Sequence, residues 1–261
     1  MAKSFADLLR RHGREVLKLE EDQAAEFGRL VKEMRERVKA KLARMDTIEK
    51  PLDAFRLRSV LAEAEASIAA LEAKAAGFWK AGSIESVDLA AAHLEEEIKR
   101  GGMDFARERV ALSIDAQAVW ADPSQKLLAN RFESSMETYG ADLLSRVRAD
   151  LFVGLRAGDS VRDVVRGVAG LEGPLGGIGM RSAERLVRTE ISQAYGVAQN
   201  DSIGLASKQI PGLVKTWWHT GSYPCPVCVP LHGTTRKINE TWTIKQGSKS
   251  REVKHPPAHP S

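Results

Sequence analysis

The chain has 261 residues, 43% of them hydrophobic and 28% charged, which is the balance of an ordinary globular protein rather than a membrane-embedded or disordered one. No run approaches the about 18 consecutive apolar residues of a transmembrane helix, and residues 1–15 lack the apolar segment of a secretory signal. Two cysteines in this length do not make a disulfide framework, so we expect a protein made in a reducing cytoplasm.

Residues 1–157 are predicted to be helical, because apolar residues recur three and four positions apart and strong helix formers dominate. Pro51 ends the first run, since proline disrupts a helix interior. Gly82-Ser83 and Gly101-Gly102 predict two further breaks. The resulting runs cover about 52–78, 84–100, 103–120 and 125–157. We expect a helical arm or bundle of long helices with short connectors.

No site is expected in this helical region. Glu20-Glu21 and Glu95-Glu96-Glu97 are acidic, but a metal site in a bundle would need a Glu-x-x-His arrangement, and His93 precedes its acids. We interpret both acidic runs as solvated helix faces.

A second domain is predicted over 158–261. Ser160 with Asp163 is typical of a helix start, and an amphipathic helix is expected over about 181–206. Beyond it, β-branched and aromatic residues predict a strand over 213–220, and residues 237–238 and 241–244 a hairpin. The expected fold is therefore a mainly α N-terminal region followed by a small α+β domain with a short antiparallel sheet.

Two carboxylates lie at the margins of the apolar stripe of the helix over 181–206. They are Glu184 and Glu190, and a carboxylate at the edge of a buried face needs a partner. Arg188 follows Glu184 by four positions, which is a favourable order for an ion pair. We expect a structural ion pair among these three residues, with Glu190 as a general base the alternative.

Both cysteines lie in Cys225-Pro226-Val227-Cys228, and four of the six histidines lie close to them. A Cys-x-x-Cys turn supplies two ligands of a tetrahedral zinc ion. We expect a zinc clip, with His219 or His232 as substitutes for one histidine. The alternatives are a redox motif, which Pro230 disfavours because a helix should open there, and cysteines that are simply buried. The expected zinc ligands are Cys225, Cys228, His255 and His259.

The charge of the chain is unevenly distributed. Residues 202–261 hold eight Lys or Arg and two acidic side chains, whereas the first 201 residues hold 31 basic and 33 acidic ones. A basic module on a near-neutral body is compatible with an anionic partner such as nucleic acid, although solvated lysines are the alternative. The candidate nucleic-acid contacts are Arg236, Lys237, Lys249, Arg251 and Lys254.

The order of motifs over residues 155–261 resembles the phage Mu F-like head morphogenesis family, also called minor capsid proteins. Arg188-Thr189-Glu190-Ile191 on a helix is followed by a strand with Trp218, then Cys-x-x-Cys with Leu231-x-Gly233, and then residues 255–260, His-Pro-Pro-x-His-Pro. One departure is that the family's closing motif continues from His-Pro to a Cys-x-Cys, whereas this sequence stops at Ser261.

The resemblance implies a non-enzymatic virion protein of tailed phages, needed for head assembly and DNA packaging or delivery. It implies several copies in the head interior or at the portal vertex, contacts with portal protein, capsid subunits and genomic DNA, no membrane, and synthesis in the host cytoplasm. The rival functions are a zinc-dependent nuclease or hydrolase using Glu190 and His219, and a zinc-ribbon DNA-binding protein, which would usually carry a second Cys-x-x-Cys.

Overall fold

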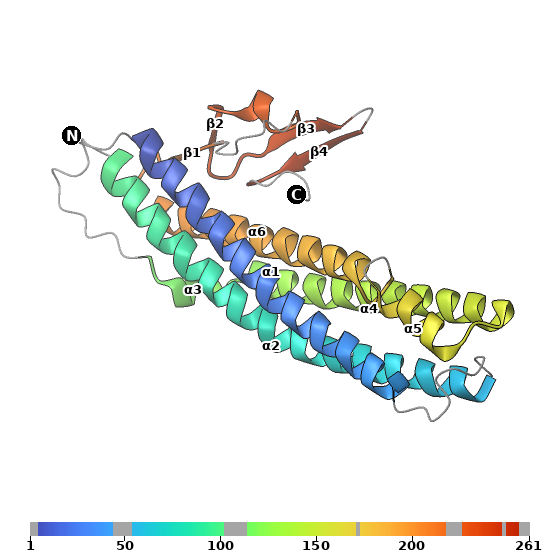
Figure 1. Ribbon diagram of the computed structural model, residues 1–261. Helices are drawn as coiled ribbons and strands as arrows, with labels where there is room; N and C mark the ends of the chain where they lie inside the picture. Colours follow the sequence, from blue (N-terminus) through green and yellow to red (C-terminus); the bar gives the residue numbers. More distant parts are fainter. Residues whose placement is uncertain are drawn as a thin grey trace. The chain divides into compact units, whose positions relative to one another are not determined.

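The chain is mainly helical, and its helices are followed by a small region of short strands (Figure 1). The structure is a computed structural model that describes residues 5–43, 54–101, 114–170, 173–217, 226–246 and 249–255. The helices are α1 (Phe5–Ala43), α2 (Ala54–Gly101), α3 (Ala116–Trp120), α4 (Pro123–Ala157), α5 (Val161–Ala169) and α6 (Gly177–Ser207). None of these described helices combines enough length with enough apolar residues to cross a bilayer. The predicted mainly helical chain is confirmed.

Capping contacts mark two helix starts, and the one predicted at Ser160 is confirmed. The Ser160 hydroxyl accepts a hydrogen bond from the Asp163 backbone N–H, as an N-cap side chain should. α4 begins at Pro123, and the carboxylate of Asp122 accepts from the Ser124 N–H at 2.9 Å. Proline is suited to this first helical position, because its missing N–H would have no partner within the helix.

The predicted break at Gly82-Ser83 is wrong, because α2 continues through it. The Ser86 hydroxyl donates to the Gly82 carbonyl at 2.8 Å, and Ser83 and Ser86 are both buried. Glycine in a helix interior lowers helix stability by about 1 kcal/mol relative to alanine. The packing of buried side chains along a long helix outweighs this loss. Of the run predicted over 103–120, residues 102–113 lie outside the described part, and α3 begins only at Ala116.

The strands form two separate antiparallel pairs. β1 (Val214–Thr216) pairs with β2 (Thr235–Lys237), and β3 (Trp242–Gln246) pairs with β4 (Lys249–Val253). The predicted hairpin of residues 237–238 with 241–244 is therefore wrong. β4 had no sequence signal, since Val253 is its one apolar residue. We call these strands and the short 3-10 helix η2 (Val229–Leu231) the C-terminal module.

The chain forms two compact units, each assembled from separate stretches. Unit 1 contains Met1–Glu21, Ala81–Leu128 and Thr189–Ser261. Unit 2 contains Asp22–Lys80 and Ala129–Arg188. The helices α1, α2, α4 and α6 thus contribute residues to both units. The predicted domain boundary between 157 and 158 stays a prediction.

Each unit has its own buried contacts. In unit 1, Leu94 of α2 belongs to the same apolar cluster as Val119 of α3 and Ala198 of α6. In unit 2, Trp79 of α2 stacks on Phe132 of α4 with ring centroids 4.7 Å apart. Trp79 is 4% exposed, so its ring is part of the buried core of this unit.

Candidate functional site

The structure describes only part of the predicted zinc clip. Cys225, His219 and His259 lie outside the described residues, whereas Cys228 is buried and His255 half-buried. The alternative ligand His232 is exposed. Within the described ranges, no three Cys, His, Asp or Glu side chains gather in a way that could hold a metal ion. The zinc clip stays a prediction.

Cys228 belongs to the core of the C-terminal module. It clusters with Trp217, Trp242 and Ile244, and it is 7% exposed. The helix that follows it within the described residues is η2, a single 3-10 turn of three residues. A redox Cys-x-x-Cys motif opens an α-helix that lowers the thiol pKa, so this local geometry disfavours the redox alternative.

Backbone and side-chain bonds hold the two tryptophans of this core. Trp217 and Trp242 meet edge to face, and the Trp242 indole N–H donates to the Thr234 hydroxyl at 2.9 Å. The Trp217 N–H donates to the Thr234 carbonyl at 2.9 Å, and the Gly233 N–H donates to the Trp217 carbonyl at 2.8 Å. Gly233 has φ +75°, which favours glycine at this turn.

One lysine of the basic segment is not a surface charge. Lys215 is 5% exposed, its Nζ donates to the Lys254 carbonyl at 3.0 Å, and it lies 5.1 Å from the centroid of the Trp242 ring. Burial lowers the pKa of Lys215, and the nearby charge of Lys254 lowers it further. The cation–π contact partly compensates for lost hydration, so Lys215 supports the module from within.

Four of the five predicted nucleic-acid contacts are exposed. Arg236 and Lys237 lie on β2, Arg251 lies on β4, and Lys254 follows it. The side chain of Lys249 is not among those described. The module therefore presents guanidinium and ammonium groups to solvent, as binding to phosphates requires.

The two acids of the segment already have polar partners. Glu240 accepts from the Lys237 N–H at 3.1 Å, and Glu252 accepts from the Thr241 hydroxyl at 2.8 Å.

The predicted ion pair of α6 involves residues of different burial. Glu190 is 3% exposed, whereas Glu184 and Arg188 are half-buried. Pairing among these three stays a prediction.

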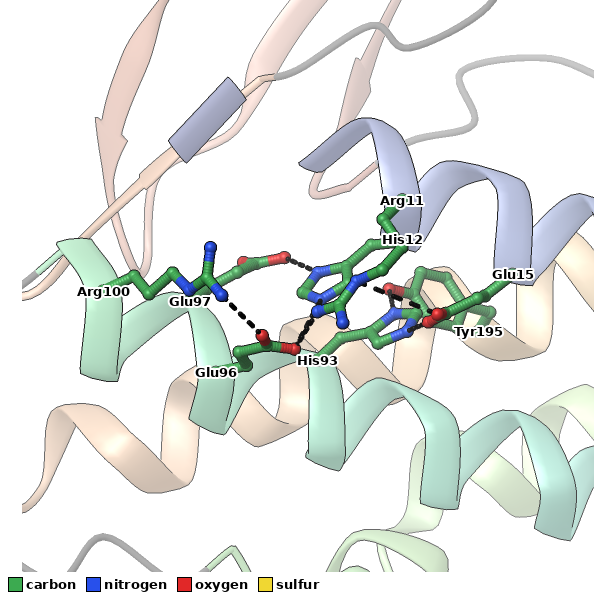
Figure 2. Close-up of polar contacts among 8 residues, drawn as sticks. All are labelled: Arg11, His12, Glu15, His93, Glu96, Glu97, Arg100 and Tyr195. Carbon is green, nitrogen blue, oxygen red and sulfur yellow. Dashed lines mark hydrogen bonds and ion pairs between the residues drawn. The ribbon is translucent and has the colours of Figure 1, made fainter. Parts of the chain in front are cut away.

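A second polar cluster, not predicted from the sequence, lies inside unit 1 (Figure 2). His12 of α1 and His93 of α2 stack with ring centroids 3.8 Å apart and planes 6° apart. Each is 3% exposed, so both rings are removed from water. We call these two residues the imidazole pair.

His12 lies between two carboxylates of α2. Its Nδ1 is 3.0 Å from Glu97 Oε1, and its Nε2 is 3.2 Å from Glu96 Oε2. Arg11 Nη2 lies 3.3 Å from the same Nε2. Burial alone lowers the pKa of His12, but the hydrogen bonds to Glu97 and Glu96 outweigh it and raise the pKa above 6.5.

His93 has one acidic and one neutral partner. Its Nε2 is 2.7 Å from Glu15 Oε2, and its Nδ1 is 2.8 Å from the Tyr195 hydroxyl of α6. Burial lowers the pKa of His93 to about 4, because Glu15 compensates only in part and the charge of His12 acts in the same direction as burial. Burial also raises the pKa of Tyr195, so its hydroxyl stays protonated.

Arginines surround the imidazole pair. Arg11 forms an ion pair with Glu96 and lies 3.9 Å from Glu15, and Arg100 lies 3.5 Å from the other oxygen of Glu96 (Figure 2). A cavity of about 300 Å³ lies beside this cluster. It is lined by Asp7, Leu8, Arg11, Arg14 and Arg100.

Comparisons of the chain with models of known protein families, with curated proteins and with solved structures found no match. Function therefore has to be argued from the residues themselves.

The interpretation of Glu95-Glu96-Glu97 as a solvated face is wrong. Glu96 and Glu97 bond to His12, and Glu95 accepts from the Ile114 N–H at 2.9 Å. One signal was present in the sequence, because Glu96 and Glu97 follow His93 by three and four positions and so share its helix face. The partner His12 lies 81 positions before His93, so the sequence alone does not indicate the contact, which forms only when α1 packs against α2.

Proposed function

We propose that this chain is a minor head protein of tailed phages, of the Mu F-like type, which acts with the portal in head assembly and in DNA packaging or delivery. The role proposed is structural rather than catalytic. The observation that carries it is the order of motifs from Arg188-Thr189-Glu190 on α6 to the His-Pro segment after β4, with Cys228 in a core of two tryptophans between them. The long helices α1, α2 and α4 supply the helical N-terminal region that such proteins carry.

The C-terminal module supports a contact with packaged DNA. Arg236, Lys237, Arg251 and Lys254 are exposed, whereas the acids Glu240 and Glu252 are engaged in hydrogen bonds within the module. Exposed guanidinium and ammonium groups bind phosphates without sequence preference by releasing counterions. Sequence-independent binding is the mode that contact with a packaged genome requires.

The proposal is tested in assembled particles. Phage heads made in a host that produces the chain together with its portal and capsid proteins are purified, analysed by mass spectrometry and imaged by cryo-electron microscopy. We expect several copies of the chain per particle, at the portal vertex or inside the head. Full, infectious particles that contain none of the chain would overturn the proposal.

A further inference from the structure

The partners of the imidazole pair determine where its protons lie (Figure 2). Glu15 offers only acceptor oxygens, so His93 must donate to it from Nε2. The Tyr195 hydroxyl then donates to the remaining Nδ1, at 2.8 Å. A neutral His93 therefore satisfies both of its contacts. A protonated His93 would donate from both nitrogens, so the Tyr195 hydroxyl would have to accept and its own proton would lose this acceptor.

His12 has the opposite environment. Both ring nitrogens face carboxylates, Glu97 at Nδ1 and Glu96 at Nε2, and each carboxylate can only accept. An imidazolium ring donates to both. If His12 loses its proton, the bond to one carboxylate is lost, and Arg11, 3.3 Å from Nε2, becomes the donor to that nitrogen.

The charges around the pair lead to the same assignment. The carboxylates of Glu15, Glu96 and Glu97 face the guanidiniums of Arg11 and Arg100, and Tyr195 of α6 adds no charge. Three carboxylates and two guanidiniums have a net charge of −1. One added proton, which makes one of the two imidazoles an imidazolium, therefore brings the net charge of the cluster to zero. A second proton would place two like charges in rings stacked at 3.8 Å, where little water can screen them.

We propose that the imidazole pair is a one-proton latch that fastens the first turns of α1 to α2 and α6, and that uptake of a second proton by His93 opens it. The latch joins three helices, since His12 and Glu15 come from α1, His93, Glu96 and Glu97 from α2, and Tyr195 from α6. All of these residues belong to unit 1. Opening exposes residues 5–21 of α1, which include the buried side chains of Leu8 and Leu19. This device is independent of the proposed head function.

The first test uses the unaltered full chain. NMR spectra of the histidine ring protons, recorded between pH 4 and 8, give the titration of each imidazole. We expect one buried histidine to keep its proton above pH 6.5 and a second to stay neutral until the pH falls well below 6. Two buried histidines that both titrate as ordinary exposed ones would overturn the assignment.

The second test follows opening by amide hydrogen exchange, corrected for the effect of pH on intrinsic exchange rates. We expect protection over residues 5–21 to fall at least tenfold between pH 6.5 and 4, while protection over residues 129–150 of α4 in unit 2 falls less. His93→Gln keeps a donor for Glu15 and an acceptor for Tyr195 but takes up no proton. We therefore expect it to abolish most of the acid-dependent loss over residues 5–21.

The matched control is His232→Gln, which changes an exposed histidine of the C-terminal module. It should leave the acid response of residues 5–21 as in the unaltered chain. The carboxylates of the cluster are the same in His93→Gln, so an acid response that they cause would persist in that variant. Persistence with an unchanged midpoint would overturn the proposal, as would protection of residues 5–21 that does not change with pH in the unaltered chain.

Discussion

Trp217 and Trp242 meet edge to face with ring centroids 5.2 Å apart, and the buried Cys228 belongs to the same cluster. The last residue of the Cys-x-x-Cys segment is thus packed in the core of the C-terminal module. A fold this small has few other apolar contacts, so its stability depends strongly on these two rings.

Truncating one ring should therefore unfold the module selectively. Trp242→Ala is expected to cost on the order of 3–5 kcal/mol, because it removes a large fully buried side chain. Trp242→Phe keeps an aromatic ring and loses the bond to Thr234, so its cost should be smaller. Hydrogen exchange over residues 235–246 measures both variants. The matched control is Val229→Ala at an exposed position, and equal effects of Trp242→Ala and Val229→Ala would contradict this account of the core.

Metal content tests the predicted zinc clip. We expect about one zinc ion per purified chain, lost when Cys225 and Cys228 are both changed to serine, because thiolates are the strongest of the predicted ligands. His255→Ala should weaken retention, and His232→Ala should not. Elemental analysis after dialysis against a weak chelator gives the result. Zinc that stays in the double cysteine variant would exclude the clip.

DNA binding should depend steeply on salt. Each phosphate contact contributes a slope of about −0.9 to the plot of log affinity against log salt concentration. Changing Arg236 and Arg251 to glutamine should make the slope shallower by roughly 2 and weaken all duplex sequences alike. Fluorescence anisotropy with two unrelated duplexes measures this. Lys99→Gln, an exposed position on α2, is the control, and an equal effect there would locate the binding surface elsewhere.

Stability should pass through a maximum near pH 6.5. The pKa of His93 is lowered to about 4 in the folded chain, so below 6.5 the unfolded chain binds more protons and stability falls, by roughly 3 kcal/mol at pH 4. The pKa of His12 is raised, so its stabilising contribution is complete below 6.5 and disappears as the pH rises through its folded value. Urea unfolding of the unaltered chain and of His93→Gln at a series of pH values measures this. Below pH 6.5 the stability of His93→Gln should fall much less than that of the unaltered chain.

Two glycines in long helices should respond oppositely to alanine. A Cβ at Gly154 of α4 would lie 2.4 Å from Cγ2 of the buried Val164, so Gly154→Ala should cost about 1–3 kcal/mol. A Cβ at Gly77 of α2 meets nothing within 4 Å among the described atoms, so Gly77→Ala should stabilise by up to about 1 kcal/mol. Thermal unfolding of the two variants gives the signs, and stabilisation by Gly154→Ala would contradict the packing of α5 on α4.

Local signals were sufficient to predict that the chain is mainly helical and that a helix begins at Ser160. Ser160 and Pro123 act within one turn of their own positions, so their effects can be predicted from sequence. Gly82 predicted a break that does not occur, because the small loss of helix stability at one glycine is outweighed by the burial of side chains along the whole of α2. β4 was missed since it gains its structure from pairing with β3 rather than from an apolar pattern of its own.

The candidate sites differ in the same way. Arg236, Lys237, Arg251 and Lys254 are exposed, as both nucleic-acid contacts and solvated charges would be, so the predicted contact with nucleic acid stays a prediction. The imidazole pair was missed, because His93 was compared only with the acids on its own helix and His12 was not considered as its partner. Their chemistry arises from stacking across two helices, which no short sequence window contains.

The discontinuous make-up of unit 1 has a consequence for the order in which the protein is completed on the ribosome. His12 is synthesised about 180 residues before Tyr195, which at ordinary translation rates is an interval of roughly ten to forty seconds. During that time the beginning of α1 exists without the α6 residues that complete its surroundings. We expect the N-terminal turns of nascent chains to be accessible to chaperones and proteases until synthesis has passed α6.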